Sequence, residues 1–135
     1  MPDSPSATLI GAARALLPRA AARYSGFRVA AVLEDESGEI HPGVNVESVS
    51  YGLSMCAERN ALFGAVARGA RGFRRIAIVS SGSGPVVPCG ACRQLLLEYA
   101  PDLVVILSGS DGPPEEVSIG DLLPRAFLSF DRTNP

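Results

Sequence analysis

The sequence predicts a three-layer α/β/α domain, and two observations support this. Apolar runs typical of buried strands occur at 74–81 (RRIAIVSS) and 103–108 (LVVILS), and segments with helical features precede them. Buried strands that alternate with helices form a sheet covered on both faces. The chain has 135 residues, 47% hydrophobic and 19% charged. We therefore expect one domain, residues 1–135, with a substantial core.

The first half of the chain predicts a helix, a hairpin and a second helix. Apolar residues recur at helical spacing in segment 6–23, which Pro18 should kink or break. Segment 27–46 has two short apolar runs around the turn-forming DESGE, which is typical of a β-hairpin. Segment 54–69 predicts a helix, with Ser54 as its N-cap and Gly69 as its stop signal.

The second half continues the alternation. After the strand at 74–81 and the loop SGSGPVVP, a helix is predicted at 89–100, with one proline just before it and another just after it. The strand at 103–108 follows, then a Gly/Pro-rich loop, a short strand at 116–119 and a last helical piece within 119–127. The predicted order is α-β-β-α-β-α-β-β-α.

Charge and the N-terminal sequence restrict the partners. The net charge is −2 and the pI is near 5.3, whereas proteins that hold nucleic acid usually carry a basic excess. We interpret the basic cluster at 67–75 (ARGARGFRR) as a solvated loop, and we expect a small, weakly charged partner and no nucleic acid. The N-terminal segment lacks the features of a signal peptide or membrane span, which predicts a cytoplasmic protein with reduced cysteines.

The three cysteines predict a metal site. Cys89 and Cys92 lie three residues apart in the first turn of a predicted helix, so their side chains share one face. Tetrahedral zinc, with Zn–S distances near 2.3 Å, needs sulfur atoms about 3.8 Å apart, which one helical turn can supply. Cys56 also lies at a predicted helix start. Two helix N-termini directed at one point favour ionised thiols.

Three thiolates with an open fourth position are typical of a catalytic zinc site. A redox pair is the alternative for Cys89 and Cys92, but such a pair needs no third cysteine. We interpret His41, the only histidine, as a surface residue in a turn with no second ligand nearby and no metal role. A glutamate in a first helical turn is usually a surface residue, but Glu58 beside a metal site can act as general acid and base.

The cysteine motifs resemble those of a known enzyme family. CAE at 56–58 with PCGAC at 88–92 matches the zinc deaminase signature, with cysteine in place of histidine. Over nearly its whole length the chain resembles the small, tetrameric cytidine deaminases. The matching blocks, in order, are YSGFRVAA (24–31), GVNVESVSYG (43–52), CAERNALF (56–63), PCGACRQLL (88–96) and LLPRAF (122–127). The resemblance implies that the α/β/α sandwich has a central mixed five-stranded sheet.

The resemblance also implies roles for individual residues. It implies one zinc ion per subunit, held by Cys56, Cys89 and Cys92, with Glu58 as the catalytic proton shuttle. The remaining implied roles are sugar hydroxyl binding by Asn45 and Glu47, an aromatic wall of the base pocket at Phe27, a backbone contact to the base at Ala57, hydrogen bonds from Arg59 to the zinc thiolates, a subunit contact at Tyr51, and contact of Phe127 with a neighbouring subunit's substrate.

The implied activity is hydrolytic deamination of cytidine and 2′-deoxycytidine, with ammonia release, for pyrimidine salvage. The implied assembly is a homotetramer with shared active sites. Three positions depart from the family pattern: Arg28 replaces a usual proline, Ala30 a usual glycine and Arg125 a usual small residue. The alternative activities are deamination of a modified cytosine nucleoside such as blasticidin S, deamination of a nucleic acid, and a non-catalytic zinc-stabilised binding module.

Overall fold

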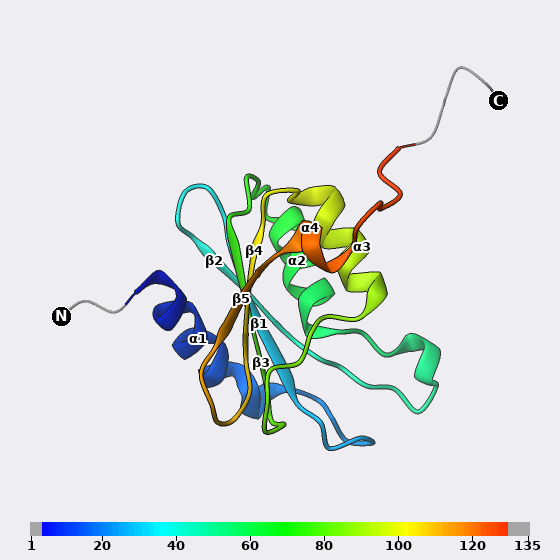
Figure 1. Ribbon diagram of the computed structural model, residues 1–135. Coiled ribbons are helices and arrows are strands. Elements are labelled where there is room, and N and C mark those ends of the chain that lie inside the picture. Colours follow the sequence, from blue (N-terminus) through cyan, green and yellow to red (C-terminus); the bar gives the residue numbers. More distant parts are fainter. Residues whose placement is uncertain (1–3, 130–135) are drawn as a thin grey trace.

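Five strands form one mixed sheet in the computed structural model, which describes residues 4–129 (Figure 1). Their order across the sheet is β2-β1-β3-β4-β5. Strands β3 and β4 pair in parallel, and the other neighbouring strands pair antiparallel. The predicted five-stranded mixed sheet is therefore confirmed. The strands are β1 (Val29–Glu34), β2 (Ile40–Val44), β3 (Arg75–Ser80), β4 (Val104–Ser108) and β5 (Glu115–Ser118).

Helices cover both faces of this sheet, which confirms the predicted three layers (Figure 1). Helix α1 (Pro5–Leu16) lies on one face and ends in a 3₁₀ turn, η1 (Leu17–Arg19), where Pro18 interrupts it as predicted. Helices α2 (Ala57–Ala67) and α3 (Gly90–Tyr99) lie on the other face, and the short α4 (Ile119–Leu122) follows β5. A second 3₁₀ turn, η2 (Tyr51–Leu53), precedes α2.

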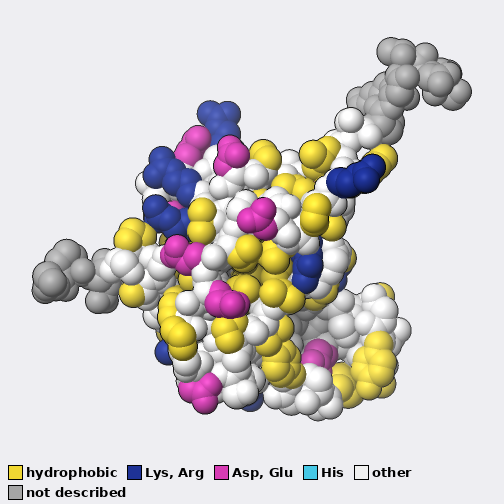
Figure 2. All heavy atoms as spheres, viewed as in Figure 1, with side chains coloured by type: hydrophobic (Ala, Val, Ile, Leu, Met, Phe, Trp, Pro, Cys, Tyr) yellow, Lys and Arg dark blue, Asp and Glu magenta, His cyan; other side chains and the backbone are white. Residues whose placement is uncertain are grey.

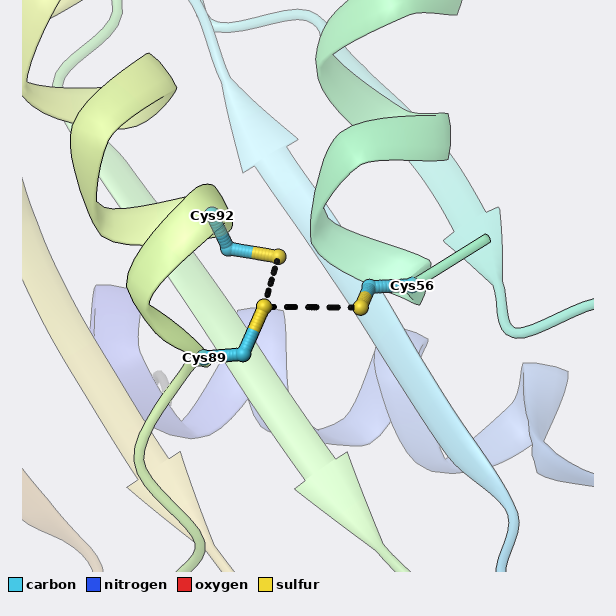
Figure 3. A group of neighbouring side chains, drawn as sticks. All are labelled: Cys56, Cys89 and Cys92. Carbon is cyan, nitrogen blue, oxygen red and sulfur yellow. Dashed lines mark hydrogen bonds between the residues drawn. The ribbon is translucent and has the colours of Figure 1, made fainter. Parts of the chain in front are cut away.

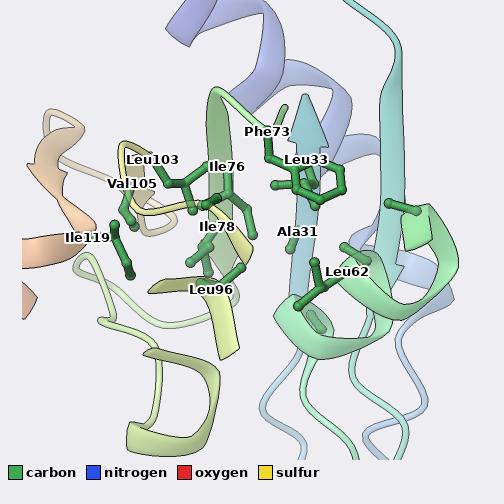
Figure 4. Packing of buried hydrophobic residues seen from close by; sticks show 14 of the residues in the cluster. Ala31, Leu33, Leu62, Phe73, Ile76, Ile78, Leu96, Leu103, Val105 and Ile119 are labelled. Atoms are coloured by element: carbon green, nitrogen blue, oxygen red, sulfur yellow. The ribbon is translucent and has the colours of Figure 1, made fainter. Parts of the chain in front are cut away.

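Each face of the sheet has its own apolar core. Because side chains alternate along a strand, Ala30 and Val32 of β1 face α1, whereas Ala31 and Leu33 face α2. The core between the sheet and α2, α3 and α4 is the larger one (Figure 4). Removal of this apolar surface from water is the main force that holds the two helices with the predicted cysteine ligands on one face.

Strand β2 approaches the start of α2 without an intervening side chain, at Gly43. A Cβ atom at Gly43 would lie 2.3 Å from the carbonyl oxygen of Ala57 and 2.4 Å from the backbone nitrogen of Ala61. Only glycine therefore fits at this position. This contact fixes the position of the end of β2. The chain continues from there to Asn45, which lies beside the first turn of α2.

Two predictions of local structure are wrong. The N-cap of α2 is Cys56 and not Ser54, whose hydroxyl accepts a hydrogen bond from the Ser48 backbone N–H at 3.0 Å. His41 is not a surface residue, since only 2% of it is exposed. It lies in β2, where the strand alternation turns its side chain inward. A second potential ligand is also close, because His41 Nε2 lies 2.8 Å from Asp35 Oδ2.

The predicted stop of α2 is confirmed. The helix ends at Ala67, and Gly69 has a φ of +80°, a left-handed conformation that favours glycine. The predicted basic cluster follows, and two of its four arginines have acidic partners. Arg71 lies 3.5 Å from Glu36, and Arg75 lies 3.1 Å from Glu34. Basic and acidic side chains lie together at this end of the molecule (Figure 2, upper left).

Within residues 4–129, no helix combines the length and the apolar character that crossing a membrane requires.

Candidate metal centre and adjoining cavity

Three cysteines converge between the starts of α2 and α3 (Figure 3). Cys56 is the N-cap of α2, Cys89 is the N-cap of α3, and Cys92 lies one turn further along α3. The Sγ atoms of Cys56 and Cys89 are 3.7 Å apart, and those of Cys89 and Cys92 are 3.3 Å apart. These distances are close to the roughly 3.8 Å edge of a tetrahedral zinc–thiolate site. The structure thus brings the three predicted ligands together.

The electrostatic environment favours a negative charge at this point. Hydrogen bonding with Cys92 and then with Arg59, against the effect of burial, lowers the pKa of the Cys56 thiol to about 5. The contact with Cys56 and burial raise the pKa of Cys92, because neighbouring thiols do not all ionise without a cation between them. Soft thiolates at this spacing suit zinc, whose positive charge would ionise all three.

Arg59 contacts the thiol cluster. Its Nη2 atom donates a hydrogen bond to Cys56 Sγ at 3.4 Å, and this bond raises the pKa of the guanidinium. A zinc ion with three thiolates would carry a net charge of −1. A neighbouring guanidinium offsets that charge and keeps the metal a better Lewis acid.

Glu58 lies in the first turn of α2, two residues after Cys56. Only 5% of Glu58 is exposed, and burial raises the pKa of its carboxyl group, with the negative charge on Cys56 adding to that effect. A general acid and base must both accept and donate a proton, and a raised carboxyl pKa makes the group a stronger base than an ordinary carboxylate. Glu58 therefore has the environment that a general acid and base requires.

A cavity of about 310 Å³ adjoins the cysteines and contains most of the predicted site. A cavity of this size falls within the range of small-molecule sites, and its walls are mostly apolar. Cys92 is fully buried and lies outside the lining. The lining residues are Phe27, Val29, Asn45, Glu47, Ser54, Met55, Cys56, Ala57, Glu58, Ile78, Val86, Val87 and Cys89.

Asn45 holds the loop that contains Phe27. Its Oδ1 atom accepts a hydrogen bond from the Val29 backbone N–H at 2.9 Å, and its Nδ2 atom donates to the Phe27 carbonyl at 2.9 Å. Both bonds define the orientation of the side-chain amide. One N–H and one oxygen lone pair of the amide remain after these two bonds.

Glu47 holds the other end of the same loop. Its Oε1 atom accepts hydrogen bonds from the backbone N–H groups of Tyr24 and Ser25, both at 3.0 Å, and its Oε2 atom accepts one from the Ser25 hydroxyl. The bond from the Ser25 hydroxyl is the main cause that lowers the pKa of Glu47. Glu47 therefore both holds this loop through hydrogen bonds and lines the cavity.

Phe127 lies outside this cavity. It is 65% exposed, and its carbonyl oxygen accepts a hydrogen bond from Gln94 Nε2 at 2.6 Å.

Two of the three residues that depart from the family pattern are outside the cavity lining: Arg28 is absent from the lining, and Ala30 packs in the core on the α1 side. Arg125 has a φ of 56°, a left-handed conformation in which a small residue fits more easily.

Sequence reasoning missed several residues of the site. Met55, Val86 and Val87 line the cavity, and their positions next to two of the cysteines could have indicated this. Arg93 was also missed. Its Nε atom donates to the Pro88 carbonyl at 2.7 Å and its Nη1 atom to the Leu122 carbonyl at 2.9 Å, so it ties the loop before Cys89 to α4.

Comparison with known proteins now decides the family. The family model described as the cytidine and deoxycytidylate deaminase zinc-binding region matches residues 5–108. The chain belongs to this deaminase family. Zinc is accordingly the cofactor of this deaminase, and the cysteine group is placed to bind it.

Individual relatives of this deaminase agree with that result. A cytidine deaminase from Halalkalibacterium halodurans is 45% identical over 109 residues, which cover 80% of this chain and 83% of that protein. A blasticidin-S deaminase from Bacillus cereus is 32% identical over 107 residues, covering 73% of this chain and 76% of that one. The crystal structure of a cytidine deaminase from Burkholderia pseudomallei matches with a TM-score of 0.86 and 48% identity, over 90% of this chain and 98% of that chain.

Proposed function

We propose that the protein is a zinc-dependent cytidine deaminase. It hydrolyses cytidine and 2′-deoxycytidine to uridine and 2′-deoxyuridine with release of ammonia, a reaction of pyrimidine salvage. The observation that carries this proposal is a cavity large enough for a nucleoside, lined by the buried Glu58 and by two of the three converged cysteines. The similarity to cytidine deaminases over most of the chain supports the same substrate class.

In the proposed mechanism, Cys56, Cys89 and Cys92 would hold zinc, which would activate the attacking water. Glu58 accepts a proton from that water as its oxygen forms a bond to C4 of the pyrimidine ring. Glu58 delivers this proton to ring N3, then takes the remaining proton from the new C4 hydroxyl and passes it to the amino nitrogen. The C4 carbonyl forms as the C4–N bond breaks and ammonia leaves. The raised pKa of Glu58 suits both transfers, because the group must gain and lose a proton within one turnover.

The lining of the cavity offers groups that suit the two parts of a nucleoside. Apolar side chains, including Phe27 and Val29, form walls for the flat base beside Glu58. We infer that the backbone of Ala57, which begins α2 at the cavity, contacts the base. Asn45 and Glu47 offer one amide donor and carboxylate acceptors, which suit the hydroxyl groups of a sugar.

A second candidate substrate is a modified cytosine nucleoside, because a blasticidin-S deaminase is among the relatives. The test is an ammonia-release assay of the purified protein with cytidine, 2′-deoxycytidine, cytosine, CMP and blasticidin S. We expect turnover of the first two, with cytosine and CMP poor substrates. Preferential turnover of blasticidin S would favour the second candidate, and no turnover of any cytosine compound would contradict the proposed function.

We also propose that the active form is a cytoplasmic homotetramer with shared active sites. Three groups of apolar side chains are exposed on the described chain, and such groups usually mark interfaces. They lie around η2, which protrudes at the lower right of Figure 1, on the outer side of α2 and α3, and near the C-terminus. The side chains are Val49, Tyr51 and Leu53, then Phe63, Val66 and Tyr99, then Phe127 and Leu128.

Phe127 is the residue proposed to complete a neighbouring site. It lies outside its own subunit's cavity, which leaves its exposed ring free for a neighbour's substrate. Phe130, the third apolar residue of this tail, lies outside the described residues. We expect Phe127→Ala to raise KM for cytidine, and native mass measurements at assay concentration to give four chains. A fully active monomer at that concentration would contradict shared sites.

A further inference from the structure

Glu47 has little hydrogen-bonding capacity left for a substrate. An ionised carboxylate offers about four acceptor positions, two on each oxygen. The two backbone N–H groups of Tyr24 and Ser25 fill Oε1, and the Ser25 hydroxyl takes one position on Oε2. One acceptor position on Oε2 therefore remains, on a side chain that lines the cavity.

The hydroxyl proton of Ser25 has a defined direction. Ser25 Oγ accepts a hydrogen bond from the Phe27 backbone N–H at 2.9 Å, so its own proton is free to point to Glu47. Gly26, with a φ of +72°, lets the chain turn back between these two residues. One hydroxyl group thus links the carboxylate of Glu47 to the backbone that holds the proposed aromatic wall of the base pocket.

Hydrogen bonds to the same loop also hold the side-chain amide of Asn45. Its amide bonds to Val29 and Phe27 leave one N–H donor and one acceptor position. Together, the free N–H of Asn45 and the free position on Glu47 Oε2 can satisfy both the oxygen and the proton of one sugar hydroxyl. This arrangement depends on a fixed direction of the Glu47 carboxylate.

We propose that Ser25 is a positioning residue for sugar recognition: its hydroxyl holds the Glu47 carboxylate so that a single acceptor faces the substrate sugar. This inference rests on the proposed function, in which Glu47 binds the sugar. Ser25 acts on the sugar through Glu47, and it has no part in proton transfer. Its loss should therefore affect KM and leave kcat nearly unchanged.

The test compares two substrates, cytidine and 2′,3′-dideoxycytidine, which lacks both hydroxyls on the sugar ring. We expect Ser25→Ala to raise KM for cytidine by about 5–20-fold, with kcat changed less than about twofold, because the held acceptor becomes free to move. For dideoxycytidine, KM should change less than about twofold. Ser25→Thr keeps a hydroxyl and should restore most of the cytidine affinity.

Ser37→Ala is the matched control. Ser37 donates its hydroxyl to Asp35 Oδ1 at 2.6 Å, so this variant also breaks a serine–carboxylate bond in a loop, but away from the cavity. It should leave both KM values unchanged. An equal KM increase for both substrates in Ser25→Ala, or no increase for either, would overturn the inference, as would a failure of Ser25→Thr to restore affinity.

Glu47→Gln separates this inference from the proposed function. Glutamine keeps one oxygen for the two backbone N–H groups and replaces the second oxygen with a donor. If Glu47→Gln leaves the cytidine-to-dideoxycytidine ratio unchanged, the sugar role of Glu47 is wrong and the proposed function needs revision. If Glu47→Gln changes that ratio and Ser25→Ala does not, only the role of Ser25 is overturned.

Discussion

The two ends of α2 each hold a cluster of ionisable side chains, and the clusters differ in what they can bind. At the start of the helix, Cys56 meets the two cysteines of α3. At its end, Arg68 is the C-cap, and its Nη1 atom lies 3.1 Å from His41 Nδ1. The positive end of the helix dipole favours thiolates, and the negative end favours the guanidinium.

Both clusters have the residue types and the spacing of a metal site. The ligand atoms of Asp35, Glu39 and His41 lie within 4.8 Å of one another, as do those of the three cysteines. However, both ring nitrogens of His41 have partners, and Asp35 Oδ1 accepts hydrogen bonds from the Ser37 hydroxyl and two backbone N–H groups. Proximity of ligand atoms alone therefore does not make a metal site, since protein donors and acceptors already occupy the ligand atoms of Asp35 and His41.

Removal of a proposed zinc ligand should have the largest effect. Cys89→Ser should reduce the zinc content from about one ion per chain to a small fraction and reduce deamination to background, because two thiolates hold zinc far more weakly than three. Elemental analysis and the ammonia assay measure both effects. His41→Gln, at the other end of α2, should retain its zinc. A Cys89→Ser protein with full zinc content would show that the ligand set is wrong.

Glu58→Gln should have the next largest effect on activity. The amide cannot carry a proton between water and the base, so kcat should fall by about 10²–10⁴-fold. Zinc content and the melting temperature should stay close to those of the wild type, since the variant preserves the size of the buried side chain. Deamination of cytidine at a near wild-type rate would contradict the proposed mechanism.

His41→Ala should affect stability and not catalysis. It leaves Asp35 and Arg68 without their shared partner, and the free energy of unfolding should fall by about 2–3 kcal/mol. Denaturant titration measures this loss, and kcat/KM of the folded variant should stay within about twofold of the wild type. Glu39→Ala is the control on the same hairpin, with an expected change below about 0.5 kcal/mol. A large loss of kcat/KM in His41→Ala would show that the two clusters are coupled.

The smallest expected effect is a pH dependence of stability at Asp35. Hydrogen bonds from the Ser37 hydroxyl, and then from His41, hold the pKa of Asp35 well below its ordinary value of 3.8. A carboxyl group whose pKa is lower in the folded state stabilises the fold above its unfolded-state pKa, and it loses this contribution as the pH falls through its folded-state pKa. The stability difference between the wild type and Asp35→Asn should thus be full at pH 6 and should narrow below about pH 4. A difference that widens in acid would contradict the lowered pKa.

The sequence was sufficient to predict the elements and the metal cluster. Alternating apolar runs and prolines at helix boundaries are local signals, and they placed Cys56, Cys89 and Cys92 at the starts of two helices. Their convergence followed because both helices pack on one face of the sheet. The helix start was misplaced at Ser54, since a serine is the stronger N-cap by type, yet tertiary contacts gave this role to Cys56.

The rest of the site depends on contacts between distant positions. His41 lies in a short strand with Pro42 and Gly43, where a turn is the usual interpretation, and only its pairing with β1 reveals the inward direction of its side chain. Ser25 and Glu47 are 22 residues apart in the sequence, and no local pattern joins them. Arg93 contacts a carbonyl 29 residues away, which the sequence likewise does not indicate.

The absence of a side chain at Gly43 has a consequence for how the site tolerates substitution. At Gly43, the strand that leads to Asn45 and the helix turn that follows Cys56 approach each other through main-chain atoms. A change in the size of one core side chain can be compensated by a neighbouring side chain, but a contact between two backbones cannot be compensated in this way. The distance between Cys56 and Asn45, a proposed sugar-binding residue, is therefore set by the packing of the main chain at Gly43. Laboratory evolution of substrate preference should find its useful changes in the loops around the cavity, while this distance stays constant.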